Sequence, residues 1–408
     1  MNTTVVGALG AGRARVDGRG RVRPTDQSWQ LDWWIGAEDR WHRAVDEVTV
    51  RQSHIESAPV VETAMRVPGG DAVQRVYGAD SAGTVVVEIE NGSAVPFVAA
   101  IALAPAAEPE GRLRSLALDG NRLRVDGATT LQLPRPPGRW AVGDAAGLAF
   151  EHVRDGRAQE GRLPDATEPG GRLEAALLFP LAHRATLRVA LAPADEIDLA
   201  SLPSANEVAR AWAAQLNRGL RVDLPDPVLS RAMQGARAAV LVGGRDVAAL
   251  EDWGFDSEAA AAWSRLSWRR RRQARRRPKR PAPWDRVRGW VETAPTGVLR
   301  PEDAGPFLLD LRSLLAHEAG DGVDLLTDLP PAWLGRDLEV HQAPTRAAGA
   351  VSYAVRWHGE RPALLWDCEQ ATTLRVPGVD PSWSTGERAG EALLAPVSPY
   401  SSVRGDSS

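Results

Sequence analysis

The sequence predicts a multidomain protein with an N-terminal antiparallel β-sandwich, a helical region and a small C-terminal antiparallel β domain. Short apolar runs separated by turn residues fill the first half of the chain. Apolar residues at helical spacing replace this pattern after Ser204. Strict alternation returns after Pro330 and Pro331, which cannot continue a helix. We therefore expect domains at 1–200, 201–327 and 328–397, and a disordered tail at 398–408.

Composition limits the classes of function. The 408 residues are 43% hydrophobic and 25% charged, as in globular proteins, and the net charge of -4 gives no global attraction to nucleic acid. There is no apolar run of about 18 residues and no secretory start, so we expect a cytoplasmic protein without a membrane span. The single cysteine, Cys368, excludes an intrachain disulfide. Seven scattered histidines without ligand spacing predict no metal and no cofactor.

The N-terminal third is predicted to consist of short strands joined by turns. Trp33-Trp34-Ile35 is one, and a hairpin is expected where Asn91-Gly92 separates two apolar runs. A spacing of about 8 to 12 residues, with no helix between the strands, is typical of a sandwich. The other predicted strands are 47–52, 59–66, 72–77, 84–90, 94–103, 113–118, 121–125, 129–133, 148–153, 173–179 and 185–191.

The segment DWWIGAEDRWH, from Asp32 to His42, concentrates tryptophans and acids. Trp33, Trp34 and Trp41 are candidates for a platform that stacks on sugar rings, because indole combines an apolar face with one hydrogen-bond donor. The alternative is a core strand followed by a salt-bridged corner. We favour the alternative, because tryptophan is more often a core residue.

The middle of the chain carries helix signals. Ser204 and Glu207 form a capping box, and Asp226 followed by Pro227 marks a second helix start. Further helices are predicted at 247–253, 257–268, 284–290 and 302–319. The predicted helices at 247–253 and 257–268 meet at a Trp-Gly turn with acids on both sides.

A basic segment follows these helices. Nine of the twelve residues from Arg269 are Arg or Lys, and like charges at this density favour a solvated linker, 269–283. The alternative is an arm that binds nucleic acid or an acidic surface; nucleic acid is not favoured, because no nucleic-acid fold accompanies the segment. The basic residues are Arg269, Arg270, Arg271, Arg272, Arg275, Arg276, Arg277, Lys279 and Arg280.

The C-terminal region carries a dense set of motifs. PPAWLG begins at Pro330, VHQAPTR ends at Arg346, and SYAVRWHG and ALLW form a predicted hairpin with its turn at 358–362. These motifs resemble the C-terminal β domain of bacterial glycosidases whose body is a six-hairpin (α/α)6 toroid, such as glucoamylase-like and debranching-type enzymes. The order of sandwich, helices and β domain along this chain is similar to theirs.

The resemblance implies a role in carbohydrate metabolism and an oligosaccharide ligand. RDVAALEDWGFDSEAAAAWSRL, from Arg245, is similar to one helical hairpin of the toroid. Arg245 and Asp246 match an Arg-Asp pair at the rim of the sugar pocket in that family, although the aromatic loop expected before them is absent. The candidate sugar-binding residues are Trp33, Trp34, Trp41, Trp253, Arg245 and Asp246. The candidate catalytic acids are Glu251, Asp252 and Asp256.

The chain is short for a complete toroid. Twelve helices with their connections need on the order of 200 residues, more than the segment 204–328 provides. We therefore expect a shortened toroid and a pseudoenzyme that binds carbohydrate or is a structural remnant. The alternatives are an active glycosidase acting on α-glucosides or oligosaccharides, and an interaction protein that uses the Arg-rich segment. A homo-oligomer could complete the helical ring.

Overall fold

The computed structural model describes residues 3–80, 82–107, 110–144, 148–192, 197–268, 271, 274–294 and 299–397. The chain divides into two compact units, unit 1 at Met1–Trp212 and unit 2 at Ala213–Ser408. The helices after residue 213 and the C-terminal sheets, which were predicted as separate regions, both lie in unit 2.

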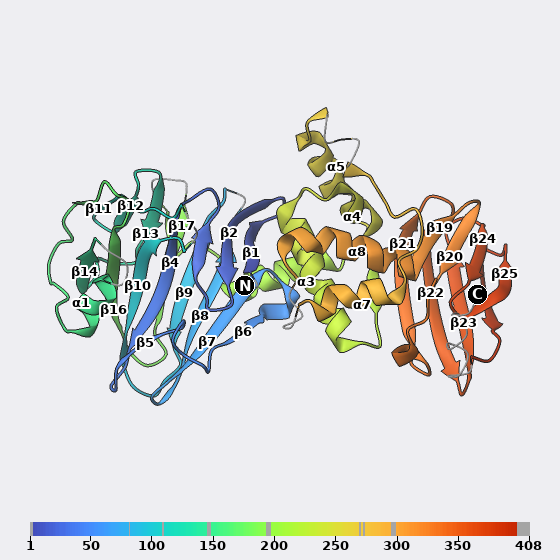
Figure 1. Ribbon diagram of the computed structural model, residues 1–408, viewed down its shortest axis with the longest axis horizontal. Coiled ribbons are helices and arrows are strands. Elements are labelled where there is room, and N and C mark those ends of the chain that lie inside the picture. Colours follow the sequence, from blue (N-terminus) through green and yellow to red (C-terminus); the bar gives the residue numbers. More distant parts are fainter. Residues whose placement is uncertain are drawn as a thin grey trace, which may run out of the picture. The chain divides into compact units, whose positions relative to one another are not determined.

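Unit 1 contains two antiparallel sheets (Figure 1). Over the described residues, one sheet has eight strands in the order β1-β2-β3-β4-β10-β16-β14, with β5 paired to β4. Its strands are β1 (Thr3–Ala8), β2 (Ala11–Asp17), β3 (Val22–Pro24), β4 (Trp29–Gly36), β5 (Trp41–Arg43), β10 (Phe97–Pro105), β14 (Arg139–Gly143) and β16 (Glu174–Leu181). This sheet carries the tryptophan-rich segment on β4 and β5.

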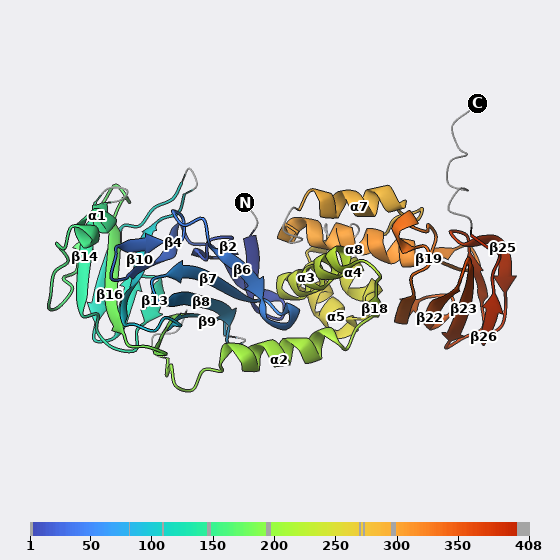
Figure 2. The same ribbon diagram turned by 90° about the horizontal axis from the view of Figure 1, so that it is seen from below.

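The second sheet has nine described strands in the order β15-β11-β12-β13-β17-β9-β8-β7-β6. They are β6 (Arg51–His54), β7 (Val60–Val67), β8 (Gly70–Gly78), β9 (Val85–Asn91), β11 (Ser115–Asp119), β12 (Arg122–Val125), β13 (Thr129–Gln132), β15 (Ala166–Thr167) and β17 (Thr186–Ala192), and the 3-10 helix η1 (Ile55–Ser57) precedes β7. Buried residues of both sheets, such as Trp33 and Ile101 from one and Val76 and Val87 from the other, share one core. The two sheets therefore pack as the predicted sandwich (Figure 2).

Three predictions in unit 1 differ from the structure. The strands flanking Asn91-Gly92 do not form a hairpin, because β9 pairs with β8 and β17 while β10 lies in the other sheet. The chain crosses between the sheets here. The side-chain amide of Asn91 stabilises the crossing by donating to the Val95 and Leu181 carbonyls at 2.9 and 3.1 Å. The predicted strand 148–153 is helix α1 (Leu148–Arg154), whose Val153 packs on the outer face of the first sheet. The predicted strand 47–52 is limited to β6, from Arg51 onward.

Helix α2 (Ala205–Leu216) contains the boundary between the units and begins at the predicted capping box. The Ser204 amide donates to Glu207 Oε2 at 2.8 Å, and the Glu207 amide donates to Ser204 Oγ at 3.3 Å. These reciprocal bonds satisfy two backbone donors that a helix start leaves unpaired. The predicted helix start is confirmed.

The helices of unit 2 follow the predicted order. Within the described residues they are α3 (Pro227–Gly243), α4 (Val247–Asp252), α5 (Asp256–Arg265), α7 (Trp284–Glu292) and α8 (Pro301–Leu315). The Asp226 carboxylate caps α3 by accepting from the amides of Val228 and Leu229 at 2.9 and 3.0 Å. Helix α8 packs against α3, α4 and α7, so it is the central helix of this group. No helix in the described ranges is long and apolar enough to span a membrane.

Two sheets complete unit 2. A five-stranded sheet has the order β18-β21-β22-β23-β26 and a four-stranded sheet the order β19-β20-β24-β25. The predicted hairpin is confirmed: β22 and β23 pair from Val351 opposite Cys368 to His358 opposite Arg361. The elements are β18 (Arg221–Asp223), β19 (Ala316–Ala319), β20 (Gly322–Leu325), η2 (Pro331–Trp333), β21 (Leu338–Thr345), β22 (Gly349–His358), β23 (Arg361–Cys368), β24 (Thr373–Val376), β25 (Asp380–Thr385) and β26 (Ala389–Leu393).

The end of α8 differs from the prediction. The helix expected over 302–319 stops at Leu315, and the chain continues directly into strand β19, which pairs with β20. The two strands are joined at Gly320-Asp321, where Gly320 has a φ of 61°. A Gly-Asp turn of this kind favours a hairpin over a helix. This junction places the last turn of α8 next to a strand and forms the candidate site.

Candidate functional site

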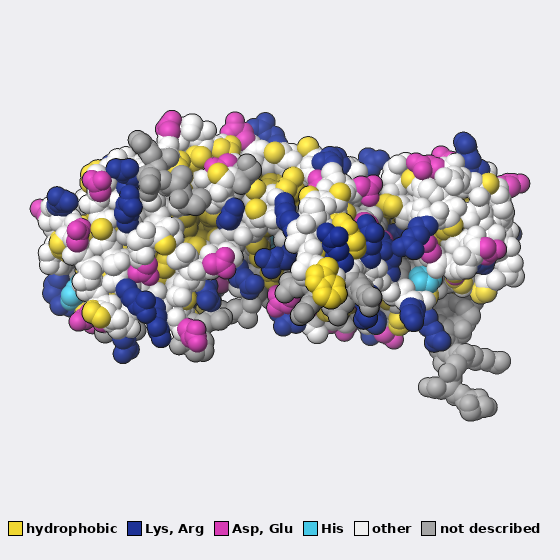
Figure 3. Space-filling view, turned by 90° about the horizontal axis from the view of Figure 1, so that it is seen from above, with side chains coloured by type: hydrophobic (Ala, Val, Ile, Leu, Met, Phe, Trp, Pro, Cys, Tyr) yellow, Lys and Arg dark blue, Asp and Glu magenta, His cyan; other side chains and the backbone are white. Residues whose placement is uncertain are grey.

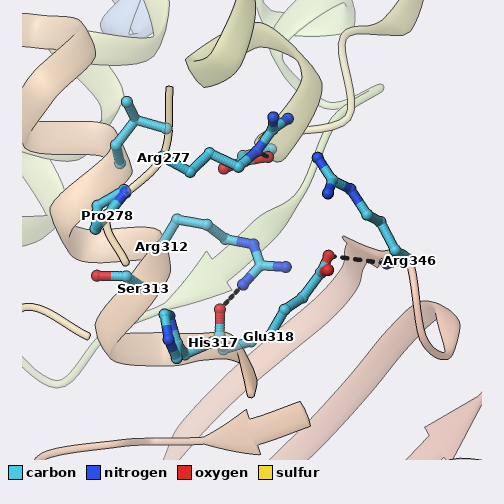
Figure 4. A pocket seen from close by; sticks show the side chains of 10 residues that line it. Arg277, Pro278, Arg312, Ser313, His317, Glu318 and Arg346 are labelled. Carbon is cyan, nitrogen blue, oxygen red and sulfur yellow. Dashed lines mark hydrogen bonds and ion pairs between the residues drawn. The ribbon is translucent and has the colours of Figure 1, made fainter. Parts of the chain in front are cut away.

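A cleft of about 230 Å³ lies in unit 2, where α8 passes into β19 (Figure 4). Its lining residues are Asp252, Arg277, Pro278, Leu309, Arg312, Ser313, Ala316, His317, Glu318 and Arg346. Pockets for drug-sized ligands have volumes of about 300–1,000 Å³. This cleft is smaller, so it suits a single sugar unit or a small group rather than a long chain.

Four segments that are distant in sequence build the cleft. Asp252 is the last residue of α4, Arg277 comes from the basic segment, and Arg312 lies in the last turn of α8. His317 and Glu318 follow on β19, and Arg346 comes directly after β21. The abrupt change from helix to strand at Leu315 brings the last turn of α8 and the start of β19 to the same opening.

Two of the predicted catalytic acids belong to one ion-pair network at this cleft. Arg277 Nε donates to Asp252 Oδ1 at 2.6 Å, and Arg277 Nη2 donates to Glu251 Oε2 at 2.8 Å. Arg275 Nε donates to the other oxygen of Glu251 at 2.9 Å. Burial raises the pKa of Asp252, although the charge of Arg277 opposes this shift. The Asp252 carboxyl group therefore holds its proton more tightly than an exposed aspartate does.

Arg312 is the most deeply buried cation of the cleft. Only 5% of the residue is exposed, and its two Nη groups donate to the carbonyls of Ala316 and Pro344. Its Nε–H is buried and has no hydrogen-bond partner among the described residues. Burial lowers the pKa of Arg312, because the charged guanidinium has lost water without a hydrogen-bonded carboxylate in return.

The strand side of the cleft adds a histidine, a carboxylate and a third arginine. Burial lowers the pKa of His317, which favours the neutral imidazole at pH 7. Glu318 is exposed, and its Oε1 accepts the backbone amide of Arg346 at 2.9 Å. The Arg346 guanidinium is exposed and makes no hydrogen bond or ion pair with a described residue. The cleft thus offers both donors and acceptors to a polar ligand.

The other predicted residues near the Trp-Gly turn lie outside the cleft lining. Trp253 is fully buried, and its indole N–H donates to the Leu308 carbonyl at 3.0 Å, so it offers no face to a sugar. Arg245 and Asp246 are both exposed residues; the Asp246 carboxylate lies against Gly305 of α8, and the partial loss of water there raises its pKa. Asp256 is exposed at the start of α5.

The three tryptophans predicted as a platform in unit 1 are held by packing. Trp33 is fully buried between the sheets, and its indole N–H donates to the Arg19 carbonyl at 3.1 Å. Trp34 is 7% exposed and meets Phe150 edge to face, with ring centroids 5.0 Å apart. Trp41 is half-buried, and its ring covers Gly36, where a Cβ atom would lie only 2.8 Å from it. These contacts are typical of core residues.

The acids beside these tryptophans form a closed corner. Glu47 Oε1 lies 2.6 Å from Arg40 Nη1 and 2.9 Å from His42 Nδ1, and His42 Nε2 lies 2.9 Å from Asp39 Oδ1. The hydrogen bond from Arg40 lowers the pKa of Glu47, and the hydrogen bond from His42 lowers the pKa of Asp39. The corner therefore favours both carboxylates in their charged form.

The described part of the basic segment is folded onto the helices of unit 2. The Arg275 guanidinium lies 4.2 Å from the ring centroid of Trp263 on α5, and Arg271 lies 5.3 Å from the same ring. Arg276, Lys279 and Arg280 are exposed. Figure 3 shows Arg and Lys side chains gathered over this helical part of unit 2. The predicted linker residues Arg269, Arg270 and Arg272 lie outside the described residues.

Sequence reasoning missed most of the cleft. Arg312, His317 and Glu318 stand in a stretch that was predicted as one long helix, which would have distributed them around its surface. The available signal was Gly320-Asp321-Gly322, which favours a hairpin with a strand before it. Arg346 belongs to the VHQAPTR motif, but no role was assigned to it.

Comparisons with known proteins give distant structural likenesses. No protein-family model and no curated protein matches the chain. Among solved structures, the chain is similar to a bacterial glucoamylase complexed with acarbose, with a TM-score of 0.43 and 9% identity over 63% of this chain and 46% of that one. It is also similar to a family GH92 alpha-mannosidase from Bacteroides thetaiotaomicron, with a TM-score of 0.25 and 8% identity over 59% of this chain and 39% of that one. The chain thus spans less than half the length of either protein.

Proposed function

We propose that this chain is a glycoside-hydrolase-like protein that binds one unit of a saccharide in the cleft of unit 2. The observation that carries the proposal is the convergence of Asp252, Arg277, His317 and Glu318, from separate segments, on one opening of about 230 Å³. Saccharide hydroxyls need donors and acceptors in close array, and these side chains supply both. The C-terminal motifs, which resemble those of toroid glycosidases, agree with this class of ligand.

Binding accounts for the cleft better than hydrolysis does. A glycosidase needs one carboxyl group free to protonate the leaving oxygen and a second to act as base or nucleophile. Asp252 and Glu251 are both hydrogen-bonded to Arg277, so neither carboxyl group is free to reach a leaving oxygen. We therefore propose a shortened toroid and a pseudoenzyme. That a second copy completes a helical ring remains a prediction.

The test is a binding panel of neutral mono- and oligosaccharides, measured by isothermal titration on the wild-type chain and on Asp252→Asn and Glu318→Gln. We expect each substitution to weaken binding by about tenfold, the value of one hydrogen bond to a charged group. Asp256→Asn is the matched control, because this exposed acid lies outside the cleft. No binding of any saccharide, or an equal loss in the control, contradicts the proposal.

Residual hydrolysis is the second candidate, and the raised pKa of Asp252 favours it, because a general acid must hold its proton near neutral pH. Glu318, an exposed carboxylate in the same cleft, would be its partner. If this candidate is correct, release of reducing sugar from α-glucosides disappears in Asp252→Asn and in Glu318→Gln. It persists in Asp256→Asn. Release that survives all three substitutions excludes the cleft as the catalytic site.

A further inference from the structure

We infer that the saccharide bound in this cleft carries an anionic group, a carboxylate or a phosphate, and that Arg312 and Arg346 bind this group. The inference rests on the proposed function, because it assumes that a saccharide occupies the cleft. It goes further by naming the chemical class of that saccharide.

The first argument is that Arg312 is buried with incomplete hydrogen bonding among the described residues. A buried guanidinium is costly unless each N–H has a partner and a negative charge lies against it. Arg312 is 5% exposed and donates to two backbone carbonyls, but no carboxylate in the described residues is hydrogen-bonded to it. Its Nε–H has no partner among the described residues. Asp252 and Glu318 act on Arg312 through their charge without a hydrogen bond, so an anion in the cleft would supply the missing acceptor.

The second argument is the balance of charge around the cleft. Three arginines and two carboxylates line it, and the neutral form of His317 is favoured. Arg277 is already bonded to Asp252 and Glu251. Asp252 and Glu318 both act on Arg312 through their charge, and within the described residues neither carboxylate is hydrogen-bonded to the side chain of Arg312 or Arg346. The lining residues therefore carry one more positive than negative charge, which matches a ligand with a single negative group.

The third argument is the direction of these side chains. In Figure 4 the side chains of Arg277, Arg312 and Arg346 all extend toward the same opening, and the Glu318 carboxylate lies between Arg312 and Arg346. Guanidinium groups match the planar oxygens of carboxylate and phosphate and bind them through paired N–H donors. Glu318 would accept a sugar hydroxyl beside the bound group.

The fourth argument is the absence of a stacking surface. None of the described residues that line the cleft is a tryptophan, tyrosine or phenylalanine. A neutral sugar ring is usually held by stacking on such a side chain together with hydrogen bonds. A cleft without that surface gains affinity mainly from charge-assisted hydrogen bonds, which an acidic sugar provides and a neutral sugar does not.

The experiment is isothermal titration of the full chain with glucose, glucuronate, glucose 6-phosphate and inorganic phosphate. We expect glucuronate or glucose 6-phosphate to bind at least about tenfold more tightly than glucose, and the comparison of the two identifies the anionic group. The preference should shrink as salt rises from about 50 to about 500 mM, because screening weakens ionic contacts at this partly open site.

Three variants locate the anion. Arg346→Gln should weaken binding of the acidic sugar by at least about tenfold. It should leave the thermal unfolding temperature unchanged, because this side chain is exposed. Arg312→Lys keeps the charge but loses the planar donor array, and it should cause a similar loss. If Arg312→Lys does not fold, Arg346→Gln decides. Arg276→Gln, an exposed arginine of the basic segment outside the cleft lining, is the matched control and should bind as the wild type.

The outcomes separate this inference from the proposed function. Equal affinity for glucose and the acidic sugars overturns the inference but leaves saccharide binding standing. Inorganic phosphate binding as tightly as glucose 6-phosphate, or a loss in Arg276→Gln equal to that in Arg346→Gln, also overturns it. If neither the neutral saccharide panel nor the acidic sugars bind, the proposed function itself fails.

Discussion

Two stretches of this chain have similar composition but differ in how their acids are paired and in whether they border a cleft. Asp32–His42 in unit 1 and Arg245–Asp256 in unit 2 both place tryptophan beside acids and an arginine. In the first, the tryptophans are packed, Asp32 pairs with Arg21, and Asp39 pairs with His42, which also contacts Glu47 just after the stretch. In the second, Glu251 and Asp252 pair with Arg277 from a later segment, and Asp252 lines an open cleft. Asp39 and Glu47 have partners that are near in sequence and form a corner, whereas Asp252 has a partner from a later segment and borders a cleft.

The pKa shifts of the corner acids and of Asp252 have opposite signs, whereas buried Asp32 of the first stretch has a raised pKa like Asp252. Glu47 and Asp39 have lowered pKa values because Arg40 and His42 stabilise their charged forms. Asp252 has a raised pKa because burial outweighs its arginine partner. The ionised corner therefore stabilises unit 1 at neutral pH, while ionised Asp252 costs stability to unit 2. Groups that cost stability in a folded protein are typical of functional sites.

The largest expected effect is that of Trp33→Ala. Removing a fully buried tryptophan should lower the free energy of unfolding by about 3–5 kcal/mol, because it leaves a cavity between the two sheets. Urea denaturation measures the change. The control is Val48→Ala, a side chain that is 91% exposed, which should change the free energy by less than about 0.5 kcal/mol. A Trp33→Ala variant that stays stable but no longer binds saccharide would support a sugar-stacking role for this tryptophan. It would contradict the claim that only the stretch in unit 2 borders a binding site.

A smaller effect is expected for Arg277→Met. This substitution leaves Glu251 and Asp252 without their shared cation, and all three side chains are only 20–24% exposed. We expect a loss of about 1–3 kcal/mol, below the value for a fully buried pair because water still reaches the site. The same substitution at exposed Arg276 should cost less than about 0.5 kcal/mol. Equal values for the two variants would mean that the network contributes no stability.

The smallest effect concerns pH. At pH 7, Glu47→Gln should lower the free energy of unfolding by about 1 kcal/mol, because the lost carboxylate accepted a hydrogen bond from Arg40. Since the folded pKa of Glu47 lies below its ordinary value of 4.5, this contribution is present above that value and disappears as the pH falls through the folded pKa. The difference between variant and wild type should therefore vanish in acid.

Asp252→Asn should show the opposite behaviour. Because the folded pKa of Asp252 is raised above its ordinary value of 3.8, stability falls as the pH rises from that value to the folded pKa, and the full cost is present above the folded pKa. The variant should be as stable as the wild type at pH 7, or more stable. Thermal unfolding of Glu47→Gln and Asp252→Asn between about pH 3 and pH 7 tests both predictions. Parallel pH curves for the two variants would contradict the distinction between corner and cleft.

The sequence predicted individual helices and turns better than it predicted which strands pair with one another. The capping box at Ser204 and the hairpin at 358–362 depend on residues within one or two turns, and both are present. The crossing at Asn91 was predicted as a hairpin because the turn residues do not reveal which sheet receives the next strand. Leu148 to Val153 was predicted as a strand from its apolar residues, although its Val153 packs as one face of a helix.

The candidate site was predicted only in part for the same reason. Asp252 was identified because the acids of the Trp-Gly turn are adjacent in sequence. Arg312 and Arg346 come together only through the helix-to-strand change at Leu315 and the return of β21, which no local pattern specifies. A binding site built from distant segments is visible once the topology is known.

Hydrogen–deuterium exchange in the presence of a saturating concentration of the tightest-binding saccharide tests the location of the site most directly. The account predicts slower amide exchange at 309–318, where α8 meets β19, and unchanged exchange at 29–43 in unit 1. Protection at 29–43, or none at 309–318, would contradict the claim that the cleft of unit 2 holds the sugar.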